Sequence, residues 1–183
     1  MSEQADGSGT LPGNPMMWIL IASEIAVFGA GLAGFAGARI FQPEVFAQSQ
    51  ATLDRLAGTL NTAVLLTSGL LAALAVSARK RGQRRMARTH LGLAGFLGLV
   101  FLVIKTIEYA EKSEAGIGIE TNTFFTLYFL LTGFHYLHVI FGLILLAIVA
   151  VWDSIENLET GAAFWHMVDL VWVLIFPVIY LVR

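Results

Sequence analysis

FFTLYFLLTGFHYLHVIFGLILLAIVAV, residues 124–151, is a long apolar segment without a single Asp, Glu, Lys or Arg. An α-helix of about 20 apolar residues crosses the hydrocarbon core of a bilayer. The segment does not alternate with a period of two, so it does not predict a β-strand. It predicts a membrane-spanning helix that is longer than one crossing needs and that therefore tilts or projects from the bilayer.

The composition of the whole chain agrees with this prediction. Hydrophobic residues make up 57% of the 183 residues, charged residues make up 13%, and the mean hydropathy is +0.75. A water-soluble domain of this length could not bury so many apolar side chains, so the composition indicates an integral membrane protein. The absence of cysteine excludes disulfides and thiolate chemistry, and the net charge of −2 gives no reason to expect a nucleic-acid partner.

Four more apolar segments accompany residues 124–151. The sequence predicts an all-α, polytopic membrane protein, a bundle of five transmembrane helices at residues 15–38, 60–78, 89–109, 124–151 and 162–182. Residues 1–14 lack the basic start of a signal peptide, and we expect a short disordered cytoplasmic tail there. Residues 15–183 then form a single transmembrane domain.

The basic residues orient the predicted bundle. Six of the eleven Lys and Arg residues lie in RKRGQRRMAR, residues 79–88, between the second and third predicted spans. The positive-inside rule places this connection in the cytoplasm. Five spans then give a cytoplasmic N-terminus and a periplasmic C-terminus. The outer stretch 41–57 is expected to contain a short helix that lies along the membrane surface.

Ionisable residues inside the spans are the informative positions, because they are costly in a bilayer and usually face the bundle interior. For Glu24, three interpretations stay open: a proton-carrying carboxyl, a lipid-facing polar anchor, and a protonated core residue with a hydrogen bond. His135 and His138 share one helix face. Neutral histidines that bond across helices explain them better than metal ligands, because no carboxylate lies beside them.

Two further pairs also lie three residues apart. His166 and Asp169 favour a hydrogen bond or an interhelical contact over catalysis. Lys105 and Glu108, near the predicted outer surface, are typical of a structural ion pair. A membrane-bound b-type haem needs two histidines on facing helices, and among the four histidines only His90 and His166 could meet in this way. We therefore do not expect this chain to catalyse redox chemistry on its own.

Small polar and aromatic residues in the spans predict helix packing. Interhelical hydrogen bonding is expected for Asn61, Thr62, Thr67 and Ser68. Trp165 and Trp172 lie on one stripe of the last span, where either anchoring at the membrane surface or packing explains them.

Five motifs occur in one order along the chain: ASEIAVF (22–28), LNTAVLLTSG (60–69), KTIEYAEK (105–112), LLTGFHYLHVIFG (130–142) and FWHMVDLVWVLIFPVIYL (164–181). Together they resemble the subunit III family of haem–copper oxidases (cytochrome c oxidase polypeptide III), over nearly everything after Pro15. The paired histidines and the WH-x-x-D-x-x-W pattern are fairly specific in combination. The family often has Gln at the position of Lys105.

The resemblance also suggests a subgroup. The chain lacks two N-terminal spans of the familiar seven-helix form and is similar to the five-helix version found in bacterial quinol oxidases. It is more similar still to the short form known as NorE, which is associated with nitric oxide reductase. The segment GIGIETNTFF (116–125) and the ending FPVIYLVR point to that form.

The resemblance implies a non-catalytic, multi-pass subunit of the bacterial inner membrane, with no haem, copper or other metal of its own. Its expected partners are the haem–copper catalytic subunit I, the companion subunits and membrane lipids, including bound phospholipid. It would stabilise the catalytic subunit and sustain its proton uptake. The recurrent polar positions of the family, implied to form an intramembrane polar network or to bind lipid, are Glu24, Glu108, His135, His138, His166 and Asp169.

Three alternatives stay open. The first is subunit III of an oxygen-reducing cytochrome c or quinol oxidase instead of a component of nitric oxide reduction. The second, from another functional class, is a small proton or solute transporter that uses Glu24 and Asp169. The third is a cytochrome b anchor that binds haem between His90 and His166.

Overall fold

The computed structural model of the chain describes residues 15–152 and 154–182, with helices throughout and no strand within these residues. The helices are α1 (Pro15–Phe41), α2 (Pro43–Ala51), α3 (Arg55–Lys80), α4 (Arg84–Glu114), α5 (Thr123–Val151), α6 (Ile155–Phe176) and the π-helical turn η1 (Pro177–Leu181). Five of the helical segments are long and apolar enough to span a membrane, so the predicted all-α, five-span architecture is confirmed. The predicted tail at 1–14 lies outside the described residues.

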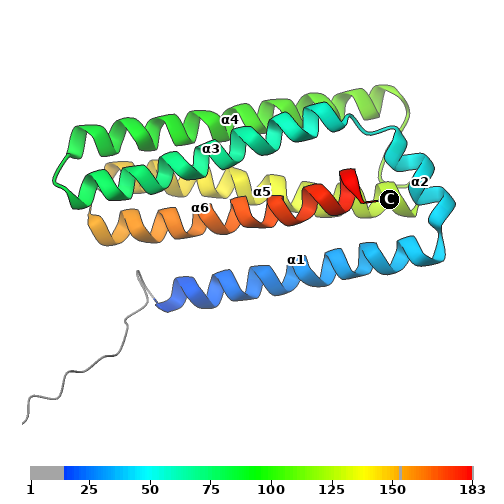
Figure 1. The fold of residues 1–183 in the computed structure, drawn as a ribbon, viewed down its shortest axis with the longest axis horizontal. Helices are drawn as coiled ribbons and strands as arrows, with labels where there is room; N and C mark the ends of the chain where they lie inside the picture. The colour runs from blue at the N-terminus through cyan, green and yellow to red at the C-terminus, as the bar shows by residue number, and fades with distance from the viewer. Residues whose placement is uncertain (1–14, 153, 183) are drawn as a thin grey trace, which may run out of the picture.

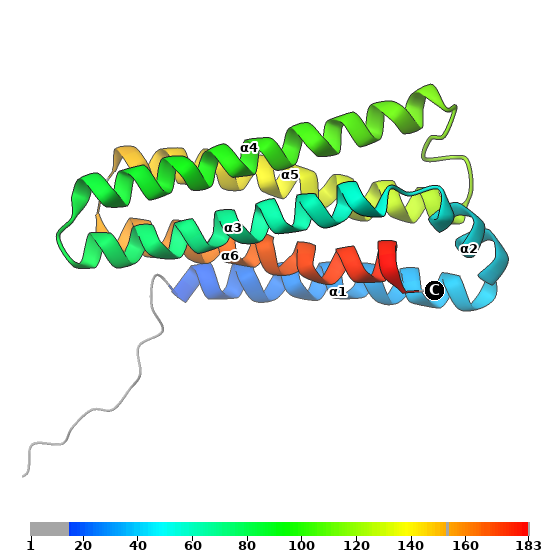
Figure 2. The ribbon, with the colours of Figure 1, turned by 45° about the horizontal axis from the view of Figure 1, so that its top comes forward.

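The long helices run side by side along one axis (Figures 1 and 2). The start of α1, the α3–α4 connection and the α5–α6 connection lie at one end of the bundle, which we call the basic end because it carries Arg79–Arg88. The short helix α2, the α4–α5 connection and η1 lie at the other end, which we call the clasp end. The described chain therefore begins and ends at opposite ends of the bundle, as an odd number of spans requires. Which end faces the cytoplasm stays a prediction.

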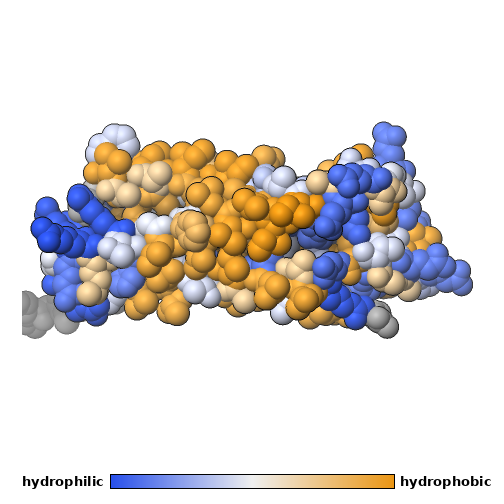
Figure 3. All heavy atoms as spheres, turned by 90° about the horizontal axis from the view of Figure 1, so that it is seen from above, coloured by the Kyte–Doolittle hydropathy of each residue, from blue (hydrophilic) through white to orange (hydrophobic). Residues whose placement is uncertain are grey.

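The outer surface matches a membrane environment. In Figure 3 an apolar band covers the middle of the bundle, and hydrophilic residues gather at both ends. Exposed leucine, isoleucine, valine and phenylalanine side chains on all five spans make up this band. Because such a surface is unfavourable in water and favourable in lipid, it supports the multi-pass membrane assignment.

The helices continue beyond the predicted spans. The basic connection predicted at 79–88 is mostly helical, since α3 ends at Lys80 and α4 begins at Arg84. Gly82, with φ of 76°, provides the left-handed backbone that the tight turn between them requires. Likewise, α6 begins at Ile155, with Ser154 as its N-cap, so most of the connection expected between the fourth and fifth spans is helix. Polar residues evidently continue these helices outside the apolar core.

The expected short helix in the stretch 41–57 is present as α2, which begins with Pro43 at its first turn. Phe46 of α2 packs edge-on against Phe35 of α1 and Phe124 of α5, with ring centroids 5.0 and 5.4 Å away. These aromatic contacts fix the end of α1 to the rest of the bundle.

Trp165 of α6 is the centre of the four-helix core formed by α3, α4, α5 and α6. Its indole lies against Gly98 of α4 and Gly142 of α5, where an added Cβ would approach the ring to 2.7 Å. Its Nε1–H donates to Ser68 Oγ at 3.0 Å, and the Ser68 hydroxyl donates to the Ala94 carbonyl of α4 at 2.7 Å. Packing, rather than anchoring at the membrane surface, therefore explains this tryptophan.

Candidate functional site

Lys105 and Glu108 lie in the core, where α4, α5 and η1 meet. The ammonium group of Lys105 donates to Glu108 Oε2 at 3.0 Å and to the hydroxyl oxygens of Tyr128 and Tyr180 at 3.0 and 2.7 Å. Both tyrosine hydroxyls donate in turn to Glu108 Oε1, at 2.7 and 2.6 Å. We call these four residues the lysine cluster.

The lysine cluster is buried. The Lys105 side chain is fully buried and that of Glu108 is 5% exposed. The ammonium nitrogen also lies 4.8–5.4 Å from the ring centres of four aromatic residues, Tyr109, Tyr128, Trp172 and Tyr180. Because burial of unpaired charges is very unfavourable, the three donated hydrogen bonds and the surrounding rings explain how this pair is tolerated.

Sequence reasoning placed Lys105 and Glu108 on one helix face but missed the two tyrosines. Tyr128 comes from the start of α5 and Tyr180 from the final turn of the chain, so no local spacing connects them to α4. The signal available in the sequence was the presence of two hydroxyl-bearing aromatic residues within otherwise apolar spans.

The last turn of the chain is held by side chains from α1 and α2. Arg39 donates from Nη2 to the Val178 carbonyl at 2.8 Å, and Gln50 donates from Nε2 to the Ile179 and Val182 carbonyls, both at 2.9 Å. Helix ends leave carbonyl groups without intrahelical partners, and these two side chains satisfy three of them. We call these contacts the clasp; sequence reasoning did not predict them.

Glu24 of α1 and His138 of α5 face each other near the middle of the bundle. Glu24 Oε2 lies 3.1 Å from His138 Nε2, and both side chains are partly exposed. His138 Nδ1 lies 2.8 Å from the Phe134 carbonyl of its own helix. The ring of Phe28 packs edge-on against His138, with centroids 5.4 Å apart. The pair therefore joins α1 to α5.

His135 has different surroundings from the Glu24–His138 pair. It is fully buried and stacks on Trp172 at a centroid distance of 5.1 Å, with Phe101 edge-on at 5.6 Å. Neither ring nitrogen has a hydrogen-bond partner among the described residues. The two histidines share a helix face but have different neighbours: aromatic rings surround His135, whereas His138 faces Glu24. The role of either in a polar network stays a prediction.

His166 and Asp169 lie where α6 faces α3. His166 Nδ1 is 3.6 Å from Asp169 Oδ2, beyond hydrogen-bond length, and Asp169 Oδ1 has no partner among the described residues. Asp169 is nearly buried because it sits over Gly69 of α3, where an added Cβ would collide with its carboxylate. The His166 side chain is 45% exposed.

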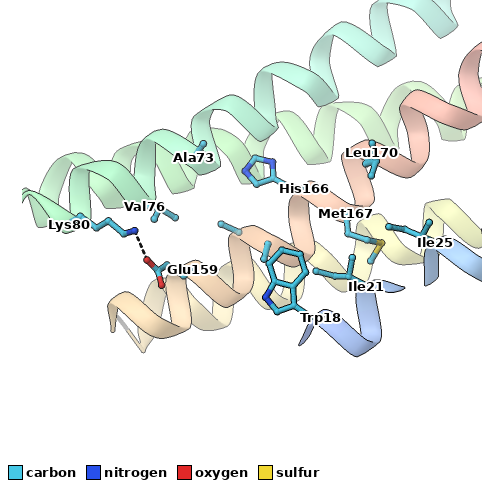
Figure 4. Close-up of a pocket in the computed structure, with 12 residues that line it drawn as sticks. Trp18, Ile21, Ile25, Ala73, Val76, Lys80, Glu159, His166, Met167 and Leu170 are labelled. Atoms are coloured by element: carbon cyan, nitrogen blue, oxygen red, sulfur yellow. Dashed lines mark ion pairs between the residues drawn. The ribbon is translucent and has the colours of Figure 1, made fainter. Parts of the chain in front are cut away.

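A groove of about 520 Å³ opens beside His166, between α1, α3 and α6 (Figure 4). At its basic end, Lys80 of α3 pairs with Glu159 of α6 at 2.6 Å. Trp18 lies on the α1 side of the groove and His166 on the α3 side. The remaining lining is apolar: Ile21, Ile25, Ala73, Val76, Ala162, Ala163, Met167 and Leu170. We call this space the lateral groove.

The small polar residues of α3 follow the predicted packing role in three cases of four. Asn61 donates to the Phe101 carbonyl at 3.4 Å, Thr62 accepts from the Trp172 indole at 3.0 Å, and Ser68 joins Trp165 to α4. Thr67 instead donates to the Ala63 carbonyl of its own helix. That part of the prediction is wrong, because the Thr67 side chain faces outward and finds its bond locally.

The predicted site residues therefore fall into separate groups: the lysine cluster with Glu108, the Glu24–His138 pair, His135 in its aromatic surroundings, and His166 with Asp169 beside the lateral groove. Within the described residues, no group of three His, Asp or Glu side chains is arranged to hold a metal ion. His90 lies on α4 at the basic end, beside Arg84 and Arg85, while His166 lines the lateral groove.

Comparison with known proteins adds to this geometry. The family model described as cytochrome c oxidase subunit III matches residues 51–182. The heme-copper oxidase subunit I+III of Aeropyrum pernix is 32% identical over 91% of this chain and 22% of its own length. Cytochrome c oxidase subunit 3 of Synechocystis is 27% identical over 89% of this chain and 72% of its own. Cytochrome bo(3) ubiquinol oxidase subunit 3 of Buchnera aphidicola is 26% identical over 90% of this chain and 84% of its own length.

Proposed function

Because the chain belongs to the cytochrome c oxidase subunit III family, we propose that it is a non-catalytic component of a respiratory haem–copper oxidoreductase. In this proposal its helices cover a flank of the catalytic subunit I, stabilise it and sustain its turnover. The complex would lie in the bacterial inner membrane.

The observation that carries this proposal is the family match across 51–182, which includes four of the five spans. The lysine cluster supports a packing role. Its two charged groups, both on α4, bond to each other and to the tyrosine hydroxyls of α5 and η1, and they are buried. A polar cluster that is satisfied internally suits the support of a neighbouring subunit better than chemistry of its own.

For the reaction of the whole complex, we favour nitric oxide reduction. The support is the similarity of residues 116–125 and of the FPVIYLVR ending to the NorE-type short form. The similarity to subunit 3 of cytochrome c oxidase and of cytochrome bo(3) ubiquinol oxidase favours the alternative, an oxygen-reducing cytochrome c or quinol oxidase. The substrate is decided in the catalytic partner, so the test must identify that partner.

We also propose that the chain binds phospholipid, at the groove between α4 and α5. This groove of about 390 Å³ has Arg88 at its basic end, and its walls are apolar, including Phe96, Leu99 and Leu143. Gly92 and Gly95 leave its floor open, since an added Cβ at either would meet no side chain closer than 3.9 Å. An arginine above an apolar groove suits a phosphate headgroup with an acyl chain below.

The test is a mild-detergent pull-down of the tagged chain from its native membrane, with an optical spectrum of the eluate. We expect a haem-bearing catalytic subunit to co-elute, and its spectrum distinguishes a nitric oxide reductase from an oxygen-reducing oxidase. The tagged chain expressed without its partner should be colourless. A Soret band in the chain alone would instead support the cytochrome b alternative, through His90 and His166.

An unrelated tagged membrane protein of similar size controls for non-specific capture. If this chain elutes alone and colourless from its native membrane, the subunit proposal is wrong. Proton flux in liposomes that contain the lone chain then tests the transporter alternative, with Glu24→Gln and Asp169→Asn as the variants that should abolish flux.

A further inference from the structure

We propose that the lateral groove between α1, α3 and α6 binds a hydroquinone that carries an isoprenoid tail. The ring would lie between Trp18 and His166, and one of its hydroxyl groups would donate a hydrogen bond to His166. The tail would follow the apolar lining toward the hydrocarbon core. The chain would hold this molecule without oxidising it.

The shape of the groove suits a small amphiphile. Its volume of about 520 Å³ lies in the range of small-molecule sites, and the lining is mostly apolar with few polar groups. Its lining includes Ile25 and Leu170, which are 38% and 47% exposed, so the groove is continuous with the apolar outer surface of the bundle. A ligand dissolved in the bilayer could therefore enter without crossing water.

The charges at the groove disfavour an anionic headgroup. Lys80 is its one cationic side chain among the lining residues, and Glu159 already neutralises it at 2.6 Å. Asp169 adds a second carboxyl group behind His166. Among the residues that line the groove, no unpaired positive charge faces a phosphate. A neutral ligand with hydrogen-bond donors fits better.

The histidine supplies the matching acceptor. Asp169 Oδ2 lies 3.6 Å from His166 Nδ1, too far for a hydrogen bond, but its negative charge attracts the ring proton to Nδ1 and so favours that tautomer. Nε2 then carries the lone pair and accepts a hydrogen bond. A hydroquinone has a hydroxyl group to donate to Nε2, whereas the oxidised quinone has only carbonyl oxygens, which cannot donate. The groove should therefore prefer the reduced form.

The ring has a flat apolar surface to lie on. Trp18 projects into the groove from α1, on the side opposite His166 (Figure 4). Aromatic rings pack favourably against each other at centroid distances of about 4.5–7 Å. Beyond the ring, Ile21, Ile25 and Leu170 extend the apolar lining along the helices, which gives the isoprenoid tail a continuous path.

The experiment measures binding of decylubiquinol and decylubiquinone to the purified full-length chain in detergent, by anaerobic calorimetric titration. We expect saturable binding of decylubiquinol that is about tenfold tighter than that of decylubiquinone, because only the hydroquinone makes the hydrogen bond to His166. His166→Phe should abolish the difference between the two forms. Ala73→Phe, which fills the groove, should abolish binding of both.

His90→Phe is the matched control, because His90 lies on α4 outside the groove, and this variant should bind as the wild type does. Equal affinities for the two redox forms, or no saturable binding, would overturn the proposal. Displacement of decylubiquinol by phosphatidylglycerol would also overturn it and would identify the groove as an acyl-chain site. The isolated chain is used throughout, so the result does not depend on the partner pull-down.

Discussion

At the clasp end of the bundle, the four residues of the lysine cluster satisfy one another in the buried core, and Arg39 and Gln50 bind carbonyl groups of residues 178–182. At the basic end, in contrast, α1 departs from its neighbours. A groove separates Trp18 from α3, and Met17 borders a second hollow beside α5 and α6. The same helix α1 is thus fixed at one end and flanked by open space at the other.

The difference between the two ends indicates where polar residues stabilise the bundle and where they are available to bind a ligand. A buried polar group that is fully bonded within the protein holds helices together and leaves no group free for a ligand. His166, whose side chain is 45% exposed, instead lies beside an open groove. The contrast predicts that stability depends on the clasp end and that ligand binding depends on the basic end.

The largest expected effect is at the lysine cluster. Glu108→Leu leaves the buried Lys105 ammonium without its counter-charge and should lower the unfolding free energy by about 3–5 kcal/mol. Unfolding in mixed detergent micelles measures this. The double variant Lys105→Met with Glu108→Leu should recover much of the loss, because no unpaired charge remains. The matched control at the basic end, Lys80→Met, breaks an exposed pair and should cost less than about 1 kcal/mol.

The next effect tests packing around Trp165. Gly142→Ala places a methyl group against the indole ring and should lower the unfolding free energy by about 1–3 kcal/mol. Gly29→Ala is the control on the open side of α1, where an added Cβ meets nothing within 4 Å. Because alanine favours helix over glycine, that variant should be neutral or more stable by up to about 1 kcal/mol. Equal losses in both variants would contradict the contrast.

A smaller loss is expected when the clasp is opened. Gln50→Leu removes two hydrogen bonds to the Ile179 and Val182 carbonyls and should cost about 1–2 kcal/mol. Hydrogen exchange should rise at the amides of η1 and the end of α1, and not at the basic end. Gln83→Leu serves as control, since the Gln83 side chain makes no capping bond at the start of α4. Unchanged exchange in η1 would show that the clasp contributes no stability.

The smallest effect on stability is expected for the Glu24–His138 pair. Glu24→Ala or His138→Ala should change the unfolding free energy of the chain by less than about 1 kcal/mol, because a single polar contact between membrane helices contributes about 0.6 kcal/mol on average. In the proposed complex, these variants should leave the haem spectrum of the partner unchanged while shortening its active lifetime during turnover. Loss of haem in either variant would argue against a purely supporting role.

Hydropathy and charge were enough to predict the five spans, since each is a long apolar segment and the bilayer fixes its length. The Lys105–Glu108 pair could also be predicted, because a spacing of three residues brings side chains together on one helix. The same spacing brings His166 near Asp169, but at 3.6 Å the two do not form the hydrogen bond that the sequence favoured. The contacts between helices could not be predicted. Gln50 meets Ile179, and Lys105 meets Tyr180, only because the folded bundle brings distant parts of the chain together.

The lateral groove was equally hidden in the sequence. It depends on how far α1 stands from α3, and small lining residues such as Ala73 and Ala163 give no signal of their own. The sequence also could not predict that His135 and His138 have different neighbours. Helical spacing gives a shared face, but the neighbours of that face, Trp172 for one and Glu24 for the other, come from different helices.

The clasp also orders events in time. Chains are synthesised from the N-terminus, and Arg39 is 139 residues ahead of the Val178 carbonyl that it binds. Until residues 178–182 have been synthesised and have folded onto the bundle, Arg39 and Gln50 lack these partners, and the first span is held by fewer contacts. Attachment of α1 through the clasp is therefore a late step of folding. A variant truncated before Val178 should keep its first helix less firmly attached.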